Sequence, residues 1–309
     1  MAHDHLHVHH HHHHDHSVAL TNVSMAFIIG ICLNFLFVII EVVVGFSIHS
    51  LSLLSDAGHN LADVGALALS LLAFRLLKVK SNEQYTYGYR KTSIIVSLFN
   101  AMLLLVSIGA ILYEAILRFI RPETNIPGFT ISIVAAVGIV INAVTALLFF
   151  RDKEKDMNVK SAYLHLMSDA VVSLGIVIGG IIIFYTHWFW IDSVLSIIIA
   201  AVILLSTWRL MKESLRLSLD GIPENIQLQD VKAAALKING VKDLHHIHIW
   251  AISTTENALT AHLVLSKDIT IEQERNIKHV LKHEFEHKNI HHVTLETERE
   301  NEPCETADC

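Results

Sequence analysis

The chain has 309 residues, of which 52% are hydrophobic and only 17% are charged, whereas soluble domains contain about 25% charged residues. The formal net charge of −7 argues against nucleic acid as a partner, and three cysteines are too few for a disulfide framework. Histidine is the unusual component, with 23 residues, so the composition predicts a membrane protein that binds borderline metal ions and excludes a simple soluble enzyme.

The N-terminal segment, residues 1–20, is a histidine-rich tail that we expect in the cytoplasm. Its first 16 residues read MAHDHLHVHHHHHHDH and contain neither lysine nor arginine, so they resemble neither a signal peptide nor a transit peptide. The run from His9 to His14 has two interpretations, an expression tag or a natural tail that collects metal. The flanking Asp-His steps favour the natural tail.

Six segments are apolar over about 20 residues, the length that a transmembrane helix needs. They lie near residues 25–48, 51–77, 92–117, 127–150, 161–185 and 188–210. We therefore expect an α-helical membrane protein with six transmembrane helices, which form a transport domain over residues 21–217.

Lysine and arginine mark one side of the predicted bundle. The loops after the second and fourth segments and the end of the sixth segment hold twelve of them, against two on the other side. The twelve are Arg75, Lys78, Lys80, Arg90, Lys91, Arg151, Lys153, Lys155, Lys160, Arg209, Lys212 and Arg216. Because positive loops stay inside, we expect a multi-pass protein of the cell (inner) membrane with both termini in the cytoplasm.

A small soluble domain is predicted after the sixth segment, over residues 218–298. Its expected elements are a helix at 226–239, strands at 241–252 and 258–265, a helix at 271–288 and a strand at 291–298. The order αββαβ is typical of a two-layer α+β fold of the ferredoxin-like type. Residues 299–309 are acidic and polar, and we expect a disordered tail there.

Two of the predicted spans carry an H-x-x-x-D pair, His59 with Asp63 and His165 with Asp169. The i, i+4 spacing places each pair on one helix face, and ionisable groups inside a membrane are functional candidates because they are costly there. Two such helices facing each other supply two imidazoles and two carboxylates, which suit tetrahedral Zn²⁺ and can take Cd²⁺ or Co²⁺. The alternative is that each pair only ties helices together as an ion pair.

Single polar residues on the apolar spans are more simply explained by contacts between helices than by metal binding. Asn34, Glu41 and Asn142 are expected to form hydrogen bonds between helices. Asp56, one turn before the first pair, is expected at a pore mouth or as a helix cap.

Four motifs together resemble the cation diffusion facilitator family of metal transporters, in particular its zinc-exporting branch. They are SLSLLSDAGHNLAD (50–63), YTYGYRK (85–91), HLMSDA (165–170) and HHIHIW (245–250), and the resemblance extends from about residue 20 to 298. It implies secondary active efflux of zinc from the cytoplasm in exchange for protons by a homodimer in the lipid bilayer. It also implies zinc as the transported substrate and a regulatory ligand, without an organic cofactor.

The resemblance assigns residues to two metal sites. The transport site matches His59, Asp63, His165 and Asp169, and histidine at the first position is associated in the family with zinc over manganese. The cytoplasmic regulatory site matches His245, His262, His291 and Glu298. Ser93 replaces a glutamate that is frequent in the family's loop, and Tyr89 with Arg90 replace loop ligands found in some relatives. We therefore expect no metal site in that loop.

Two other functions stay open beside transport. A membrane-bound metal sensor would use the histidine tail and the soluble domain without coupled flux. A membrane metallohydrolase is suggested by H-E-x-x-H at residues 283–287, but the neighbours KHEFEHK indicate a solvated charged face rather than a catalytic helix. Cys304 and Cys309 either capture metal or belong to a free tail. We expect a transporter and not an enzyme.

Overall fold

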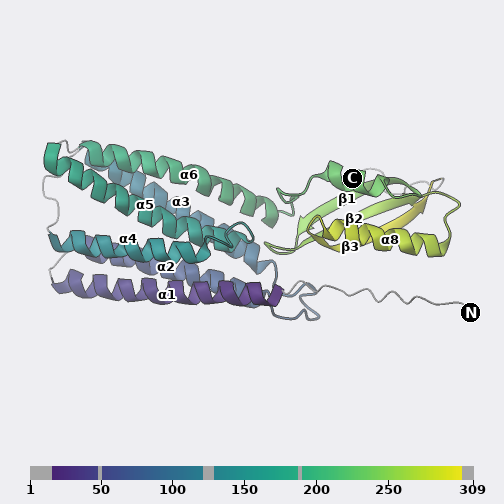
Figure 1. Cartoon of the computed structure of the whole chain (residues 1–309), viewed down its shortest axis with the longest axis horizontal. Coiled ribbons are helices and arrows are strands. Elements are labelled where there is room, and N and C mark those ends of the chain that lie inside the picture. The colour runs from purple at the N-terminus through teal and green to yellow at the C-terminus, as the bar shows by residue number, and fades with distance from the viewer. Residues whose placement is uncertain (1–15, 48–50, 121–128, 187–189, 301–309) are drawn as a thin grey trace, which may run out of the picture.

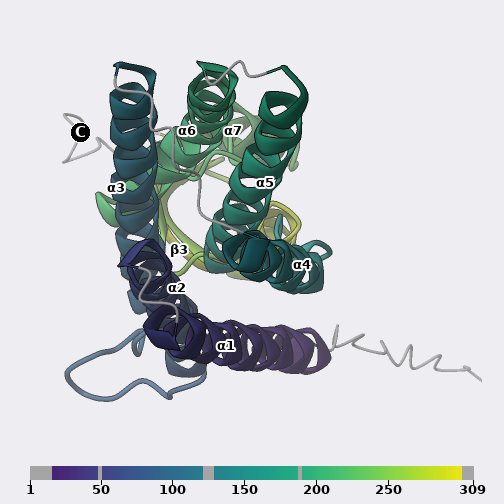
Figure 2. The ribbon, with the colours of Figure 1, turned by 90° about the vertical axis from the view of Figure 1, so that its left-hand side faces the viewer.

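The computed structural model describes residues 16–47, 51–120, 129–186 and 190–300. It has two parts along its long axis, a bundle of helices and a smaller unit built on a β-sheet (Figure 1). The helices of the bundle are α1 (His16–Ser47), α2 (Leu51–Leu76), α3 (Thr92–Ile120), α4 (Phe129–Phe149), α5 (Met157–Thr186) and α6 (Trp190–Ser218). Figure 2 shows these helices from the end away from the sheet.

The bundle is held by packing of neighbouring apolar helices. α1 packs on α2, α3 on α6, and α4 on α5, while α5 also contacts α2, α3 and α6. The rings of Phe27, Phe74 and Phe149 meet in one cluster, with centroids 5.5 and 4.7 Å from that of Phe27. Other large apolar side chains point outward, Val106 and Leu205 among them, so the bundle presents an apolar surface.

Within the described residues, Val23–Ser47 and Thr92–Ala110 are long and apolar enough to cross a membrane, by length and composition alone. Polar side chains link the helices, as the sequence predicts for two of them. The Nδ2 of Asn34 in α1 donates to Thr145 of α4 at 3.4 Å, and Glu41 accepts from Asn60 of α2 at 2.9 Å. The Oδ1 of Asn142 is buried and accepts no hydrogen bond from a described residue. The side chain of Asp56 lies outside the described ones.

The second part has the predicted αββαβ order. Its elements are α7 (Leu228–Leu236), β1 (Val241–Ala251), β2 (Asn257–Leu265), α8 (Ile271–Glu286) and β3 (Ile290–Arg299). The sheet order is β1-β2-β3, with β1 antiparallel and β3 parallel to β2. Helix α8 makes the crossover that a parallel pair requires. The core lies on one face of the sheet, where Leu244, Leu263, Leu281 and Phe285 are fully buried.

α1 begins at His16 rather than near residue 25, so residues 16–20, expected in the tail, belong to this helix. α5 and α6 are also longer than the sequence predicts, and both of their extensions face the sheet domain. α5 begins at Met157 because Asp156 accepts hydrogen bonds from the backbone amides of Asn158 and Val159, at 2.7 and 3.2 Å. α6 continues to Ser218 because Leu217 is buried at the junction of the two parts.

Most of the two terminal tails predicted from the sequence lies outside the residues that the structure describes. Residues 1–15 and 301–309, which include Cys304 and Cys309, are not among the described residues. Residue 299, assigned to a disordered tail from the sequence, instead ends strand β3. Arg299 forms an ion pair with Glu274 of α8 at 3.1 Å, which explains why the strand continues.

Candidate metal centres

The first candidate centre lies inside the helix bundle. Asp63 of α2 and His165 and Asp169 of α5 each offer one ligand atom, and these atoms lie within 4.8 Å of one another. The Nε2 of His165 contacts Oδ1 of Asp63 and lies 3.9 Å from Oδ2 of Asp169. The side chains of His165 and Asp63 are only 8% and 5% exposed. This is one imidazole and two carboxylates in a nearly closed site.

Helix periodicity and one helix contact create this arrangement. His165 and Asp169 are one turn apart on α5, so they share a face. α5 packs against α2, which brings Asp63 to that face. Two carboxylates and a neutral imidazole would balance the charge of a divalent ion, and such a nitrogen and oxygen set suits a borderline metal.

His59 is the fourth residue predicted for this site. It lies in α2 one turn before Asp63, and therefore on the same helix face. Its side chain lies outside the described ones. The structure therefore brings three of the four predicted residues together, and the role of His59 stays a prediction.

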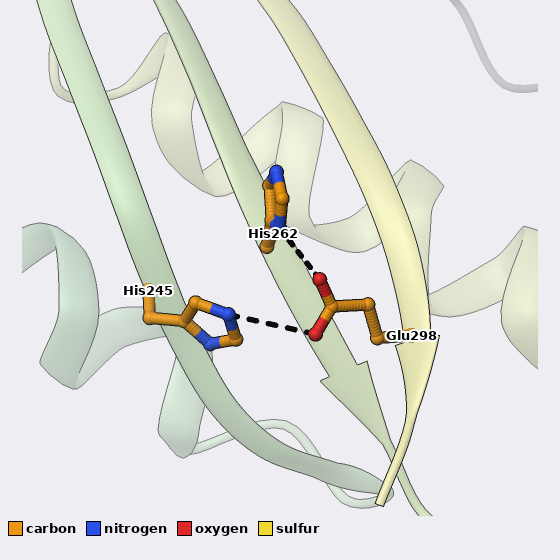
Figure 3. Close-up of side chains that lie close together, drawn as sticks. All are labelled: His245, His262 and Glu298. Atoms are coloured by element: carbon orange, nitrogen blue, oxygen red, sulfur yellow. Dashed lines mark hydrogen bonds and ion pairs between the residues drawn. The ribbon is translucent and has the colours of Figure 1, made fainter. Parts of the chain in front are cut away.

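The second candidate centre lies on the sheet, with one residue from each strand (Figure 3). His245 of β1 pairs directly with His262 of β2 in the strand register, and Glu298 comes from β3. Glu298 lies between the two imidazoles, 2.5 Å from Nδ1 of His262 and 3.5 Å from Nε2 of His245. One ligand atom from each lies within 4.8 Å of the others. We call these three residues the cytoplasmic triad.

Strand alternation explains the position of the cytoplasmic triad. Leu263 points into the core, so its neighbour His262 points to the opposite face of the sheet. Glu298 is on the same open face, because Leu295, three residues earlier, packs against the core.

The comparisons with known proteins cover both parts of the structure. Residues 27–217 match the family model described as cation efflux transmembrane domain, and residues 223–300 match the model described as cation efflux protein, cytoplasmic domain. The chain belongs to the cation diffusion facilitator family. The resemblance seen in the motifs is thereby confirmed, and so is the prediction of a membrane protein with a soluble cytoplasmic domain.

Curated relatives of this cation diffusion facilitator are metal antiporters, efflux proteins and transporters by name. It is 38% identical over 269 residues to the cadmium, cobalt and zinc/H(+)-K(+) antiporter of Bacillus subtilis, which covers 85% of each chain. It is 38% identical to the metal cation efflux system protein CzcD of Cupriavidus metallidurans, over 91% of this chain and 87% of the relative. It is 34% identical to the zinc transporter ZitB of Pectobacterium atrosepticum, over 85% of this chain and 81% of the relative.

The cytoplasmic domain of this cation diffusion facilitator departs from the sequence prediction at His291. This exposed residue lies at the other end of β3, seven residues or about 23 Å from Glu298 along the strand. The odd separation also puts it on the opposite face, so the structure does not bring it to the cytoplasmic triad.

His246 is a neighbour of the cytoplasmic triad that the sequence did not assign to the regulatory site. Its φ is 50°, and it lies where the register between β1 and β2 shifts. This irregularity stacks its ring on that of His262, with centroids 4.7 Å apart. The sequence alternates regularly here and gives no sign of a bulge, so it does not predict the contact between His246 and His262.

Proposed function

We propose that this protein exports Zn²⁺ from the cytoplasm in exchange for protons, with His59, Asp63, His165 and Asp169 as the transport site. The observation that carries the proposal is the buried cluster of one imidazole and two carboxylates between α2 and α5. Buried ionisable groups inside an apolar bundle mark ion pathways. The relatives named as zinc, cadmium and cobalt transporters support the same cargo, and Cd²⁺ and Co²⁺ are further candidates.

Competition between Zn²⁺ and protons for one site would couple the export of the metal to the inward movement of protons. The cluster binds a metal only when its imidazoles are neutral and its carboxylates are ionised, so protonation of these groups expels the ion. Imidazole and carboxylate groups both bind and release protons, so they suit such exchange. Zn²⁺ would enter from the cytoplasm, the helices would rock, and protons would displace the ion on the outer side. Each inward proton gains about 2.3 kcal/mol per 100 mV of membrane potential.

We propose six membrane crossings with both termini in the cytoplasm of the cell (inner) membrane. Three contacts support this orientation, because they tie lysine- and arginine-rich loops to the sheet domain. Arg90 and Lys91 from the α2–α3 loop pair with Glu256 and Asp220, and Asp156 from the α4–α5 loop contacts Thr254. The positive loops and the sheet domain therefore share one end of the bundle, the end that the positive-inside rule assigns to the cytoplasm.

The cytoplasmic triad is our candidate for a regulatory zinc site in a homodimer. His245, His262 and Glu298 supply three ligands, and a tetrahedral Zn²⁺ needs a fourth, from water or from a second copy of the chain. A membrane metal sensor would use this triad together with the histidine tail, without coupled flux. The triad is the observation in favour of that second function.

Zinc accumulation separates transport from sensing. Everted membrane vesicles with an acidic interior should accumulate Zn²⁺, and nigericin, which collapses the pH gradient, should stop the accumulation. Asp169→Asn removes a ligand charge and should strongly reduce uptake at low zinc concentration, whereas Asp268→Asn, on an exposed loop, is the matched control. Zinc that binds to the wild-type protein without accumulating in the vesicles would refute transport and favour the sensor.

A further inference from the structure

The turn between β1 and β2, residues 252–256, lies against the N-terminal ends of two bundle helices. The hydroxyl of Thr254 donates to Oδ2 of Asp156, directly before α5. The amide of Thr254 donates to Oγ of Ser93 in the first turn of α3, at 3.1 Å. Arg90, just before α3, pairs with Glu256. One turn of the cytoplasmic domain therefore contacts the start of both helices.

Asp156 performs two tasks at this junction. Its Oδ1 caps α5 by accepting from the amides of Asn158 and Val159, and its Oδ2 accepts from Thr254. Helix caps are commonly solvated, but here the cytoplasmic domain covers the carboxylate, whose residue is 6% exposed. This burial raises the pKa of Asp156. The cap of α5 is thus completed by a residue about 100 positions later in the chain.

Apolar packing fixes the same junction. Ala251, the last residue of β1, is fully buried in a cluster with Ile94, Met157, Leu210 and Leu217. These four residues come from α3, α5 and α6. The end of β1 is therefore embedded in the bundle rather than tethered to it by a loop.

Two rigid elements meet at this junction, and each carries a candidate metal ligand. α5 is continuous from the cap at Asp156 to His165, about 14 Å away at 1.5 Å per residue. β1 carries His245 six residues before Ala251. The two candidate metal centres are therefore joined through one strand, one helix and the contact between them.

We propose that the Thr254–Asp156 contact positions α5 and carries the influence of the cytoplasmic triad to the transport site. The inference rests on the proposed transport function. Coupling between distant sites requires elements that link them and whose arrangement both sites bias. β1 and α5 link the two sites, and the experiment below tests whether both sites bias them. Thr254 and Asp156 act here as positioning residues, because neither touches the metal.

The test is a double-mutant cycle on zinc transport into proteoliposomes. Thr254→Val removes the hydroxyl at nearly constant shape and leaves the Oδ1 cap intact. Thr254→Ser keeps the hydroxyl, and Thr255→Val is the matched control at an exposed position of the same turn. Each is combined with Glu298→Gln, which weakens the cytoplasmic triad, and the half-saturating zinc concentration and maximal rate are measured separately.

We expect Glu298→Gln to change transport in the wild type, in Thr254→Ser and in Thr255→Val. In Thr254→Val the ratio of rates with and without Glu298→Gln should be about one, since the two sites no longer communicate. An equal effect of Glu298→Gln in all backgrounds would refute the coupling, and so would the absence of any effect in the wild type. Zinc accumulation by the wild type would in either case leave the proposed transport function standing.

A second readout covers the case in which Thr254→Val does not fold. Asp156→Ser keeps a capping oxygen but is too short to reach Thr254. Hydrogen exchange of residues 157–164 in the full chain should slow on addition of zinc in the wild type and stay unchanged in Asp156→Ser. Slowing in both proteins would overturn the proposal. Peptides that contain the cytoplasmic triad report separately whether zinc binds there.

A different observation points to a metal site on α8. His283 and His287 are exposed on consecutive turns, and their ring centroids lie 4.6 Å apart. His287 caps the C-terminus of the helix, where the backbone dipole favours a cation. The geometry points to a two-imidazole chelate for Zn²⁺, Ni²⁺ or Cu²⁺, which all accept such ligands. The buried Phe285 between them belongs to the core, so the pair sits on a stable helix face.

Carbethoxylation of histidines, resolved by mass spectrometry on the full chain, tests this chelate. Zinc should protect His283 and His287 together, and His283→Gln should remove the protection of His287. His291, also exposed, is the reference that zinc should leave reactive. Equal reactivity of the pair with and without zinc would refute the site, as would protection of His287 that survives His283→Gln.

Discussion

The sharpest prediction concerns Asp63→Asn, which keeps the shape of the side chain and removes one charge from the bundle site. An ion bound by the three ligand atoms would lie about 2 Å from each, as Zn²⁺ does with nitrogen and oxygen ligands. Two unit charges 4 Å apart interact by about 4 kcal/mol at an effective dielectric constant near 20, and here the distance is shorter and the ion divalent. The lower desolvation cost of the neutral amide offsets part of this loss. We expect zinc affinity to fall by about 3 kcal/mol, or about 100-fold.

The assay is zinc uptake into proteoliposomes as a function of zinc concentration. The asparagine can still hydrogen-bond to His165, so the melting temperature of the detergent-purified variant should stay close to that of the wild type. Asp152→Asn, which removes a carboxylate from the α4–α5 loop, is the matched control for loss of charge. A half-saturating zinc concentration in Asp63→Asn equal to that of the wild type would show that Asp63 is not a ligand.

Three further outcomes are expected. His59→Asp adds an oxygen ligand and a negative charge to the site. Mn²⁺ and Cd²⁺ should therefore compete better with Zn²⁺ in uptake assays, and the pH dependence of uptake should shift. An unchanged metal ranking would exclude His59 as a ligand. Deletion of residues 1–16 should leave uptake measurable, and its loss would make the tail part of the pathway. Lys278 donates a hydrogen bond to Glu274 and lowers its pKa, so this carboxylate stabilises the fold above pH 4.5 and the effect fades as the pH falls through the lowered pKa. Glu274→Gln should therefore cost up to about 1 kcal/mol near pH 7 and flatten the dependence of the melting temperature on pH in acid, and an unchanged acid profile would contradict the shift.

Local patterns in the sequence predict the elements, and contacts between distant residues decide their ends. The six long helices and the αββαβ order follow from apolar length and periodicity, which are properties of short windows. The early start of α5 depends on Asp156, whose second oxygen is bound by Thr254 from another domain. The extension of α6 depends on the burial of Leu217 beside Ala251 at the same junction. A single sequence contains no record of such pairings.

The same limit applies within the two metal centres. The i, i+4 spacing of His165 and Asp169 is readable because a helix makes residues one turn apart into neighbours. For β-strands the register must also be known. The shift between His245 and His248 stacks His246 on its neighbours and could not be foreseen. His291 is a different case, because its distance from Glu298 and its opposite face follow from their spacing on one strand.

Burial distinguishes what the two centres can do with similar ligands. In the bundle site the side chains of Asp63 and His165 are 5% and 8% exposed, so an ion there would exchange with water only when the surrounding helices move. That requirement suits transport, because an open path to both sides at once would leak protons. In the cytoplasmic triad the side chain of His245 is 30% exposed, so bound metal can equilibrate with the cytoplasm without a change in the bundle. A centre with free access can follow the cytoplasmic zinc concentration, and a closed centre can carry the ion. This difference in access, more than the ligands themselves, favours regulation at the sheet and transport between α2 and α5.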